Sequence, residues 1–365
     1  MGLTLTPIPQ AFSRLKLWFA LAAILNVPPR AYTAATHDVN YDVRLTGLIE
    51  RSRVTELQSA AVDRLARSKR GLKVHWHPIT QSPRFLYSTE ELLSPARIDN
   101  GRVAWHKAQG KPVRITGADA EAVVRNYINT NKDLFGHDAR ILLPGEARPE
   151  RSHEDPQTGV WMLMWVQEMA GIRIDGALMK ATVTPQGELV AISSSFLPDP
   201  AASADRRVPQ WRQALGRPGV SESQALRMAM WAVGEEPEDG VEVEADNGRR
   251  QFAAEGLDGP ASLERVWLPL NRDQLTLAWN ISLQGKGIGR MLGVRVDAQS
   301  GEVLMREDLT RDAVTASYRV FDPISPRPQA TAYNYTPTSP EPAVSAQTDK
   351  VVSTTLASPD GWIGN

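Results

Sequence analysis

The sequence changes twice from a helical apolar period to a strand-like one, and this order most constrains the fold. Thr116 and Asp119 stand at capping-box spacing before apolar residues at helical intervals, and the pattern closes near Gly136. Residues 161–196 then read as three antiparallel strands joined by tight turns. Because a helix and a sheet each bury one face against the other, this half is predicted to form one α+β unit.

The second half of the chain repeats this order. Ser221 and Gln224 form another capping box at the start of a helix that ends near Gly234. Four strands are predicted after it, at 263–270, 274–283, 290–298 and 302–308. The turn sequences agree as well, because VTPQGELV (183–190) is answered by VDAQSGEVL (296–304). We therefore predict an α+β fold of two tandem units, each an antiparallel sheet packed on a helix.

Other segments flank the two units. Residues 52–70 have a helical period and residues 73–79 alternate like a strand, which predicts an N-terminal helix–strand segment. Six prolines fall between Pro323 and Pro342 among Ser, Thr and Ala, a composition typical of an extended Pro-rich C-terminal tail. The expected divisions of the chain are 1–35, 36–112, 113–200, 201–312 and 313–365.

The first 35 residues have the pattern of a secretory signal peptide. Arg14 and Lys16 precede an apolar run at 17–25, and prolines and small residues follow. The run is about half of the ~20 residues that a membrane span needs. We therefore expect a secreted, periplasmic or extracellular protein that is cleaved near Ala34 or Ala35 and then has no stable membrane association.

Composition excludes several classes of function. Lys and Arg number 41 against 42 Asp and Glu, so the net charge of -1 gives no electrostatic footprint for nucleic acid. The chain has no cysteine, which excludes disulfide scaffolds, thiol nucleophiles and zinc sites built on Cys. Any metal would need His and carboxylate ligands alone.

Two histidines and a glycine-rich segment are candidates for ligand binding. His75 and His77 share one face of a predicted strand, about 7 Å apart, a spacing that suits two ligands of one metal. No third ligand is visible, so paired or solvent-facing histidines are favoured. The segment GKGIG (285–289) superficially suggests a phosphate loop but lies between two strands, where a hairpin turn is expected.

Carboxylates and tryptophans also have structural interpretations. Four carboxylates fall in or beside the last two predicted strands: Asp297, Glu302, Glu307 and Asp308. We do not interpret them as an acid/base pair, because Glu302 follows a turn and the others lie on alternating strand faces. Four tryptophans fall on predicted strands: Trp161, Trp165, Trp267 and Trp279. We expect them to pack in the core rather than to form a surface that binds a ligand.

Glycines and polar residues mark the strand ends and turns of both units. In the first unit they are Gln167, Glu168, Gly171, Gly176, Gly187 and Glu188, and in the second Gly301 and Glu302. With NKDLFG (131–136) ahead of them, residues 155–199 resemble the fungalysin/thermolysin propeptide domain, and residues 221–233 with 296–308 are similar to a PepSY module. We expect these to be structural turn positions, with positive φ at Gly171 and Gly187.

The end of the chain extends this resemblance. Residues 316–328 and 358–365 resemble the join between prosequence and peptidase in the fungalysin family of zinc metallopeptidases. The resemblance makes 113–200 a fungalysin/thermolysin propeptide-like unit, 201–312 a PepSY-like unit, and 313–365 a linker toward an absent peptidase domain.

The chain departs from that family in its catalytic motif. A peptidase of this type carries His-Glu-x-x-His on a helix, but the nearest string here is HEDPQ (153–157), which has Gln157 in place of the second His and a helix-breaking Pro156. This string is interpreted as a turn before a strand. We therefore expect no catalytic, cofactor-binding or metal-binding residues, no cofactor, and no enzyme activity.

The resemblance implies a secreted propeptide that acts as intramolecular chaperone and inhibitor of a fungalysin-type zinc metallopeptidase. The expected partner is the metallopeptidase domain, in cis in a truncated precursor or in trans. Two alternatives stay open: a stand-alone secreted peptidase inhibitor, and an envelope structural or ligand-binding module.

Overall fold

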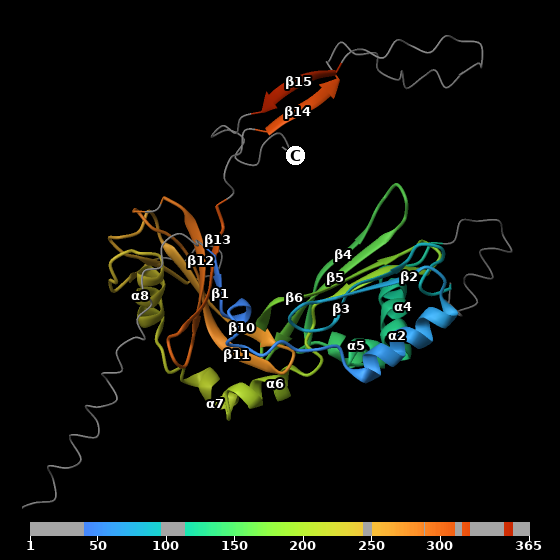
Figure 1. Cartoon of the computed structure of the whole chain (residues 1–365), viewed down its shortest axis with the longest axis horizontal. Coiled ribbons are helices and arrows are strands. Elements are labelled where there is room, and N and C mark those ends of the chain that lie inside the picture. The colour runs from blue at the N-terminus through green and yellow to red at the C-terminus, as the bar shows by residue number, and fades with distance from the viewer. Residues whose placement is uncertain are drawn as a thin grey trace, which may run out of the picture. The chain divides into compact units, whose positions relative to one another are not determined.

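The computed structural model describes residues 40–95, 114–243, 250–287 and 289–310, together with two strands at 316–321 and 347–352 (Figure 1). The predicted signal peptide and most of the predicted tail lie outside the described residues. The chain divides into two compact units, Met1–Glu307 and Asp308–Asn365.

The larger unit is mixed α+β, which confirms the predicted fold class. Its helices, as far as residues are described, are α2 (Glu56–Ser68), α4 (Gly117–Thr130), α5 (Lys132–Phe135), α6 (Pro200–Arg207), α7 (Trp211–Gly216) and α8 (Glu222–Ala232), with 3-10 turns η1 (Val43–Leu45) and η2 (Ala139–Leu142). Its first strands are β1 (Tyr41–Asp42), β2 (Leu72–Trp76), β3 (Pro83–Ser88), β4 (Ala147–Glu154), β5 (Trp161–Met169), β6 (Ile172–Val183) and β7 (Leu189–Ser194). The later strands are β8 (Val241–Val243), β9 (Arg250–Ala253), β10 (Ala261–Asn271), β11 (Gln274–Gln284), β12 (Met291–Asp297) and β13 (Val303–Asp308).

Two antiparallel sheets meet at one parallel contact. The first has the order β4-β5-β6-β7-β3-β2, and the second runs from β10 through β11, β12 and β13 to β1, with β9 and β8 on the other side of β10. Strand β6 pairs with β10 in parallel at Ile174 and Trp267. The two predicted units are therefore joined within one sheet rather than through a separate linker.

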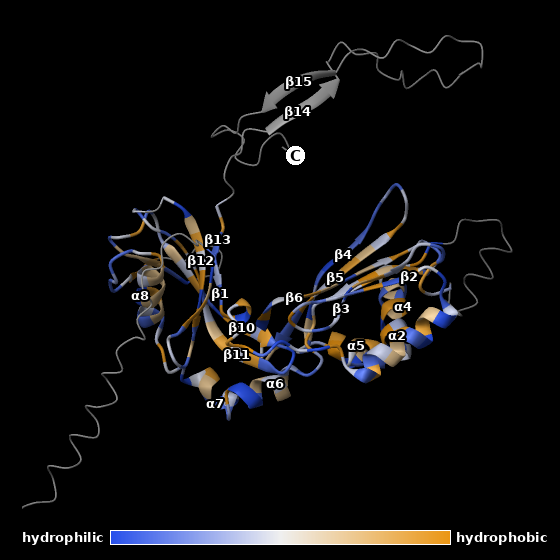
Figure 2. Cartoon of the chain, viewed as in Figure 1, coloured by the Kyte–Doolittle hydropathy of each residue, from blue (hydrophilic) through white to orange (hydrophobic). Residues whose placement is uncertain are grey.

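Each predicted helix begins at its capping box and buries its apolar side. The boxes at Thr116–Asp119 and Ser221–Gln224 are both formed, and Thr55–Gln58 adds a third at α2. The buried residues of α4 are Ala120, Val123, Val124, Tyr127 and Ile128, and those of α8 are Ala225, Leu226, Ala229 and Met230. These helix residues and apolar residues of the strands belong to one hydrophobic core (Figure 2).

The internal repeat extends to individual hydrogen bonds in the turns. In the first unit, Thr184 N–H donates to Glu188 O, and Gly187 N–H donates to Thr184 O, both at 2.9 Å. In the second, Asp297 N–H donates to Glu302 O (2.8 Å), and Gly301 N–H donates to Asp297 O (2.9 Å). The later turn is one residue longer but closes with the same pair of bonds.

A tryptophan ties each sheet to the start of its helix. Trp161 Nε1 donates to Ile115 O (3.3 Å), and Trp279 Nε1 donates to Val220 O (3.0 Å). Ile115 and Val220 each directly precede the residue that caps the helix. Both indoles therefore make the same contact in their units, as expected for two repeated units.

Some elements were not predicted. Strand β4 is almost wholly exposed and mostly hydrophilic beside the more apolar β5, so it has no strand-like apolar alternation (Figure 2). Its pairing with β5 supplies the structure that its own pattern does not. The string HEDPQ spans the end of β4 and the turn to β5, where Gly159 N–H donates to Asp155 O.

The smaller unit contains two strands within the predicted tail. Strands β14 (Ala316–Phe321) and β15 (Gln347–Val352) pair antiparallel from Ala316–Val352 to Phe321–Gln347. Part of this stretch therefore forms a two-stranded sheet.

Among the described residues, no helix is both long and apolar enough to cross a membrane.

Candidate functional site

Three of the four predicted motif glycines, Gly171, Gly187 and Gly301, lie in turns between strands, whereas Gly176 lies within β6, where the register with β5 shifts. Ala170 and Gly171 both have positive φ (52° and 74°) and join β5 to β6 as a two-residue hairpin turn. Gly176, Gly187 and Gly301 have φ of 70°, 84° and 76°. The positive φ predicted for Gly171 and Gly187 is confirmed.

The polar motif residues hold the main chain in place. Gln167 is fully buried; its Nε2 donates to Leu197 O and its Oε1 accepts from Leu197 N–H, both at 2.8 Å. Glu168 pairs with Arg148 (2.9 Å), and Glu188 Oε2 accepts from the Thr184 hydroxyl (3.0 Å). These side chains therefore stabilise the ends of strands through hydrogen bonds and an ion pair.

We expect Gln167→Leu to lower the free energy of unfolding by about 3 kcal/mol. The substitution keeps the apolar volume but leaves the N–H and C=O of buried Leu197 without partners, at ~1–3 kcal/mol for each group. Gln186→Leu, at an exposed turn position, is the matched control and should change stability by about 0.5 kcal/mol or less. Urea titration measures both, and equal losses would contradict the clamp on Leu197.

Gly187→Val should destabilise the chain more than Glu188→Ala. A β-branched residue at φ 84° incurs about 1–2 kcal/mol of backbone strain. Glu188→Ala loses one hydrogen bond to a partly exposed partner, worth about 0.5–1 kcal/mol. Denaturation midpoints that shift equally would show that the turn does not need glycine.

His75 and His77 are not brought together as ligands. His75 is exposed and stacks on Tyr87, with centroids 6.4 Å apart. His77 lies beyond the end of β2, and its Nδ1 accepts from the Thr80 N–H (3.2 Å). Burial, followed by the charges of Arg84 and Arg44, lowers the pKa of His77 to about 4. Across the described part of the chain, no group of three His or carboxylate residues could hold a metal ion.

The glycine-rich segment connects β11 to β12, as predicted for a hairpin turn. Gly287 N–H donates to the Glu235 carboxylate at 2.7 Å, and Lys286 N–H donates to Gly256 O at 3.1 Å. Ile288, within this segment, lies outside the described residues.

The carboxylates of the last strands do not form a catalytic pair. Asp297 is buried and accepts from the Thr276 hydroxyl and from the amides of its own turn. Glu302 contributes its main-chain carbonyl to that turn, and Asp308 accepts from Thr310 N–H. Glu307 pairs with Arg295.

That arginine belongs to an ion network across the contact between the sheets. Arg295 contacts Asp175 (3.2 Å) as well as Glu307 (2.7 Å). Arg173 joins Asp175 (3.2 Å) to Glu264 (2.7 Å). The network thus connects β6 with β10, β12 and β13, and each of its carboxylates has a cationic partner.

Two residues that have a buried polar atom without a partner in the described structure, His137 and Trp211, line a cavity of about 1070 Å³, which we call the Arg272 cavity. Arg272 lines it from the turn between β10 and β11. Nη1 of Arg272 donates to Gln58 Oε1, and Gln58 is itself fixed because its Nε2 donates to Gln81 O (2.8 Å) and Leu134 O (3.1 Å). This second layer holds the guanidinium in one orientation.

The guanidinium of Arg272 packs against the end of α5, where a residue with a side chain would be too close to it. Gly136 ends α5 with φ 78°, and a Cβ there would lie 2.9 Å from Arg272 Nη2. Burial lowers the pKa of Arg272 from its ordinary value. No carboxylate pairs with Arg272 among the residues that the structure describes.

His137 contributes an unused hydrogen-bond acceptor. Its Nδ1 lies 3.0 Å from Asp138 O, so Nδ1 carries the proton and donates. Burial lowers the pKa of His137 to about 4, with the charge of Arg272 acting in the same direction, so the ring is neutral at pH 7. The buried Nε2 therefore presents a lone pair and has no donor in the described structure.

Trp211 contributes an unused donor. It is 3% exposed and packs edge-to-face against Trp267, with centroids 5.6 Å apart, while Arg212 lies over its ring at 4.3 Å. Its buried Nε1–H has no acceptor in the described part of the chain. Gln210, just before it, has φ 61°, a conformation that non-glycine residues rarely adopt and that places Trp211 at the start of α7.

The lining of the cavity has four cations and four carboxylates. The lining cations that have no carboxylate partner in the described structure are Lys132, Arg212 and Arg272. Of the lining carboxylates, Asp133 pairs with Arg64, Asp138 pairs with Arg140, and Asp199 caps α6. Only Glu146 is left without such a role among the described side chains.

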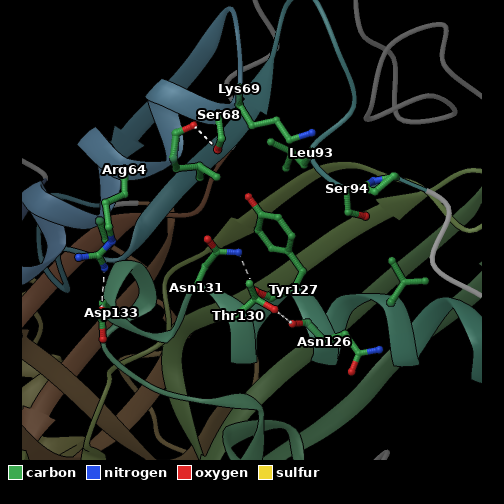
Figure 3. A pocket seen from close by; sticks show the side chains of 14 residues that line it. Arg64, Ser68, Lys69, Leu93, Ser94, Asn126, Tyr127, Thr130, Asn131 and Asp133 are labelled. Atoms are coloured by element: carbon green, nitrogen blue, oxygen red, sulfur yellow. Dashed lines mark hydrogen bonds and ion pairs between the residues drawn. The ribbon is translucent and has the colours of Figure 1, made fainter.

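A second pocket, of about 420 Å³, lies between α2 and α4. Figure 3 shows Tyr127 rising from α4 into it, and the buried phenol oxygen has no partner in the described structure. The cations here are occupied, because Arg64 pairs with Asp133 and Lys69 donates to Leu92 O and pairs with Glu91. We therefore regard the Arg272 cavity as the stronger candidate.

Comparisons with known proteins give only a distant structural similarity. No known family profile and no curated protein matches the sequence. A solved structure similar to this chain is the C-terminal domain of YpeB from Bacillus megaterium, with 11% identity and a TM-score of 0.26 over 72% of this chain and 100% of that one.

Proposed function

We propose that the chain is a secreted, non-catalytic prosequence that assists folding of a fungalysin-type zinc metallopeptidase and inhibits it, in cis or in trans. The observation that carries the proposal is the repeated helix-on-sheet unit. Its equivalent turns contain the residues on which the sequence resembles the fungalysin/thermolysin propeptide domain and the PepSY module, from Gly187–Glu188 to Gly301–Glu302.

An exposed sheet edge provides a means of contact with a peptidase. A peptidase cleft can bind a partner as an added strand. In the first sheet, β4 carries Pro149, a bulge and several charges, which are typical of an edge protected against such pairing. Strand β2 is the edge strand on the other side of this sheet. It pairs with β3 in regular register from Leu72 to His75. We propose β2 as the edge that the peptidase meets.

The inhibition experiment uses the full chain and a purified fungalysin-type peptidase that cleaves a fluorogenic peptide. We expect the rate to fall at least tenfold at a molar excess of the chain, while mass spectrometry shows the chain intact. A serine peptidase is the control for specificity, and thermally unfolded chain is the control for the folded state. A peptidase that is indifferent to a large excess of folded chain would exclude this function.

A further inference from the structure

Two methionines of β5 point away from the core. Met162 and Met164 alternate along this strand with Leu163 and Trp165, which are both buried in the core that the first sheet shares with α4. Met162 is 46% exposed and Met164 is half-buried. Residues two apart on a strand lie on one face of the sheet, about 7 Å from each other. The open face of the first sheet therefore presents two neighbouring thioethers.

A histidine on the adjacent strand lies beside this pair. His153 of β4 is directly opposite Met162 in the antiparallel register. Such residues project to the same face, with Cβ atoms about 4.5–5.5 Å apart. His153 is exposed and has no hydrogen bond, ion pair or ring contact with any described residue. The hairpin of β4 and β5 (Figure 1) thus brings two thioethers and one free imidazole to the same surface.

We propose that Met162, Met164 and His153 bind a soft monovalent metal ion, copper(I) in the cell. Thioether sulfur selects copper(I), and imidazole is also a ligand for copper. Three rotatable bonds in each Met side chain allow two sulfurs that start about 7 Å apart to meet at one ion above the sheet. All three ligands are neutral, so a monovalent ion brings only a single charge to this water-exposed surface.

The donor set distinguishes this ion from zinc and calcium. Structural zinc sites use four Cys, His or carboxylate ligands, and calcium takes oxygen ligands. In the part of the chain that the structure describes, no group of three His or carboxylate residues could hold either ion. The absence of cysteine excludes thiolate sites but leaves thioether sites possible. The proposed site therefore lies outside the expectation that a metal would need His and carboxylate ligands alone.

The charges around the three ligands are too weak to prevent binding. Arg151 and Lys180 lie on either side of Met164 in the register and repel a cation, whereas the charge of Asp155 interacts with that of His153 and attracts one. A like charge at ~4 Å in water weakens binding about fivefold. This is less than the ~10–100-fold that even supporting residues contribute to metal sites.

This inference does not rest on the proposed inhibition. The peptidase is proposed to meet β2, whereas the metal site lies on β4 and β5, on the other side of the same sheet. A chain without effect on any peptidase would still bind the ion, and a chain that fails to bind it could still inhibit.

The first experiment titrates silver(I) nitrate into the full, untagged wild-type chain in chloride-free buffer, with calorimetric detection. Silver(I) is a soft monovalent ion that air does not oxidise, and copper(I) is then measured under nitrogen by competition with bicinchoninate. We expect one tightly bound ion for each chain, with an affinity for silver(I) roughly a hundredfold or more above that for zinc(II). Absence of silver(I) binding, or equal affinities for silver(I) and zinc(II), would overturn the proposal.

Three variants place the site. Met162→Leu and Met164→Leu keep the apolar volume and remove one thioether each, and His153→Gln removes the imidazole. Each should weaken silver(I) binding by about tenfold or more. Met228→Leu on α8 and His75→Gln on β2 are matched controls at exposed positions and should keep the wild-type affinity. Wild-type affinity in any of the three ligand variants, or an equal loss in the controls, would overturn the assignment.

An NMR readout on the wild-type chain does not depend on how the variants fold. With isotope-labelled methionine methyl groups, the resonances of Met162 and Met164 are assigned by their absence in the two Leu variants. Both should shift when silver(I) saturates the chain, and the resonance of Met228 should not. Unshifted resonances of Met162 and Met164 at saturation would show that the ion binds elsewhere and would overturn the proposal.

Discussion

Trp267→Ala should lower the free energy of unfolding by about 4–5 kcal/mol, a large part of the ~5–15 kcal/mol that a folded chain has. Trp267 is fully buried and heads the largest buried side chains of the described core. It stands at the parallel contact opposite Ile174, its Nε1 donates to Met169 O (3.1 Å), and its ring meets Trp211. The truncation therefore leaves a cavity where the two sheets join and removes the hydrogen bond to Met169 O.

Two further variants separate the causes of this loss. Trp267→Phe keeps most of the volume and removes the hydrogen bond, so it should cost about 1–2 kcal/mol. Trp231→Ala on α8, where the side chain is 37% exposed, should cost much less than Trp267→Ala. Guanidinium titration measures all three, and a similar loss for Trp231→Ala and Trp267→Ala would show that the contact between the sheets is not a stabilising centre.

The second large effect is a loss of stability in acid. His137 and His77 have pKa values lowered from 6.5 to about 4 in the folded chain, chiefly by burial. The unfolded chain takes up a proton on each near pH 6.5, while the folded chain resists until about pH 4. Stability is therefore full above pH 6.5 and falls as the pH drops towards 4, by at most about 3 kcal/mol for His137 and by less for the partly exposed His77, where water screens the charge.

His137→Gln and His77→Gln should each reduce this fall, and the double variant should remove most of it. His153→Gln, at an exposed position on β4, is the control and should leave the fall unchanged. The measurement is the free energy of unfolding from urea titrations at half-unit steps between pH 4 and 7. A double variant with the wild-type pH dependence would exclude these histidines as its cause.

The repeat was predictable because local patterns carry it. Capping boxes place both helices, apolar alternation places the strands that bury a face, and the turn sequences around Gly187 and Gly301 repeat visibly. Three of the four strand tryptophans are buried as expected, while Trp161 is only half-buried and donates to Ile115 O. The sequence therefore predicted those features that depend on residues close to one another in the chain.

The Arg272 cavity was not predictable by the same means. Its key groups come from an N-terminal helix, the end of α5, α7 and the turn after β10, so Gln58 and Arg272 are brought together from more than two hundred residues apart. The sequence indicated that a helix closes near Gly136, but not that a guanidinium packs there. No sequence motif marks Trp211 or His137, because the feature they share is a buried ring nitrogen without a hydrogen-bond partner in the described structure.

The single parallel contact between β6 and β10 also affects how the chain is made. The first half of β6 has β5 on one side and depends on β10 for the other, since β7 pairs only from Met179 onward. Trp267 follows Ile174 by about 90 residues, so at ~5–20 residues per second a ribosome needs roughly 5–20 s to supply it. Through that interval the nascent first unit presents an open strand edge, a template for pairing with other chains. The second repeat thus protects the first from aggregation, and fragments that stop before residue 261 should be recovered mainly from the insoluble fraction.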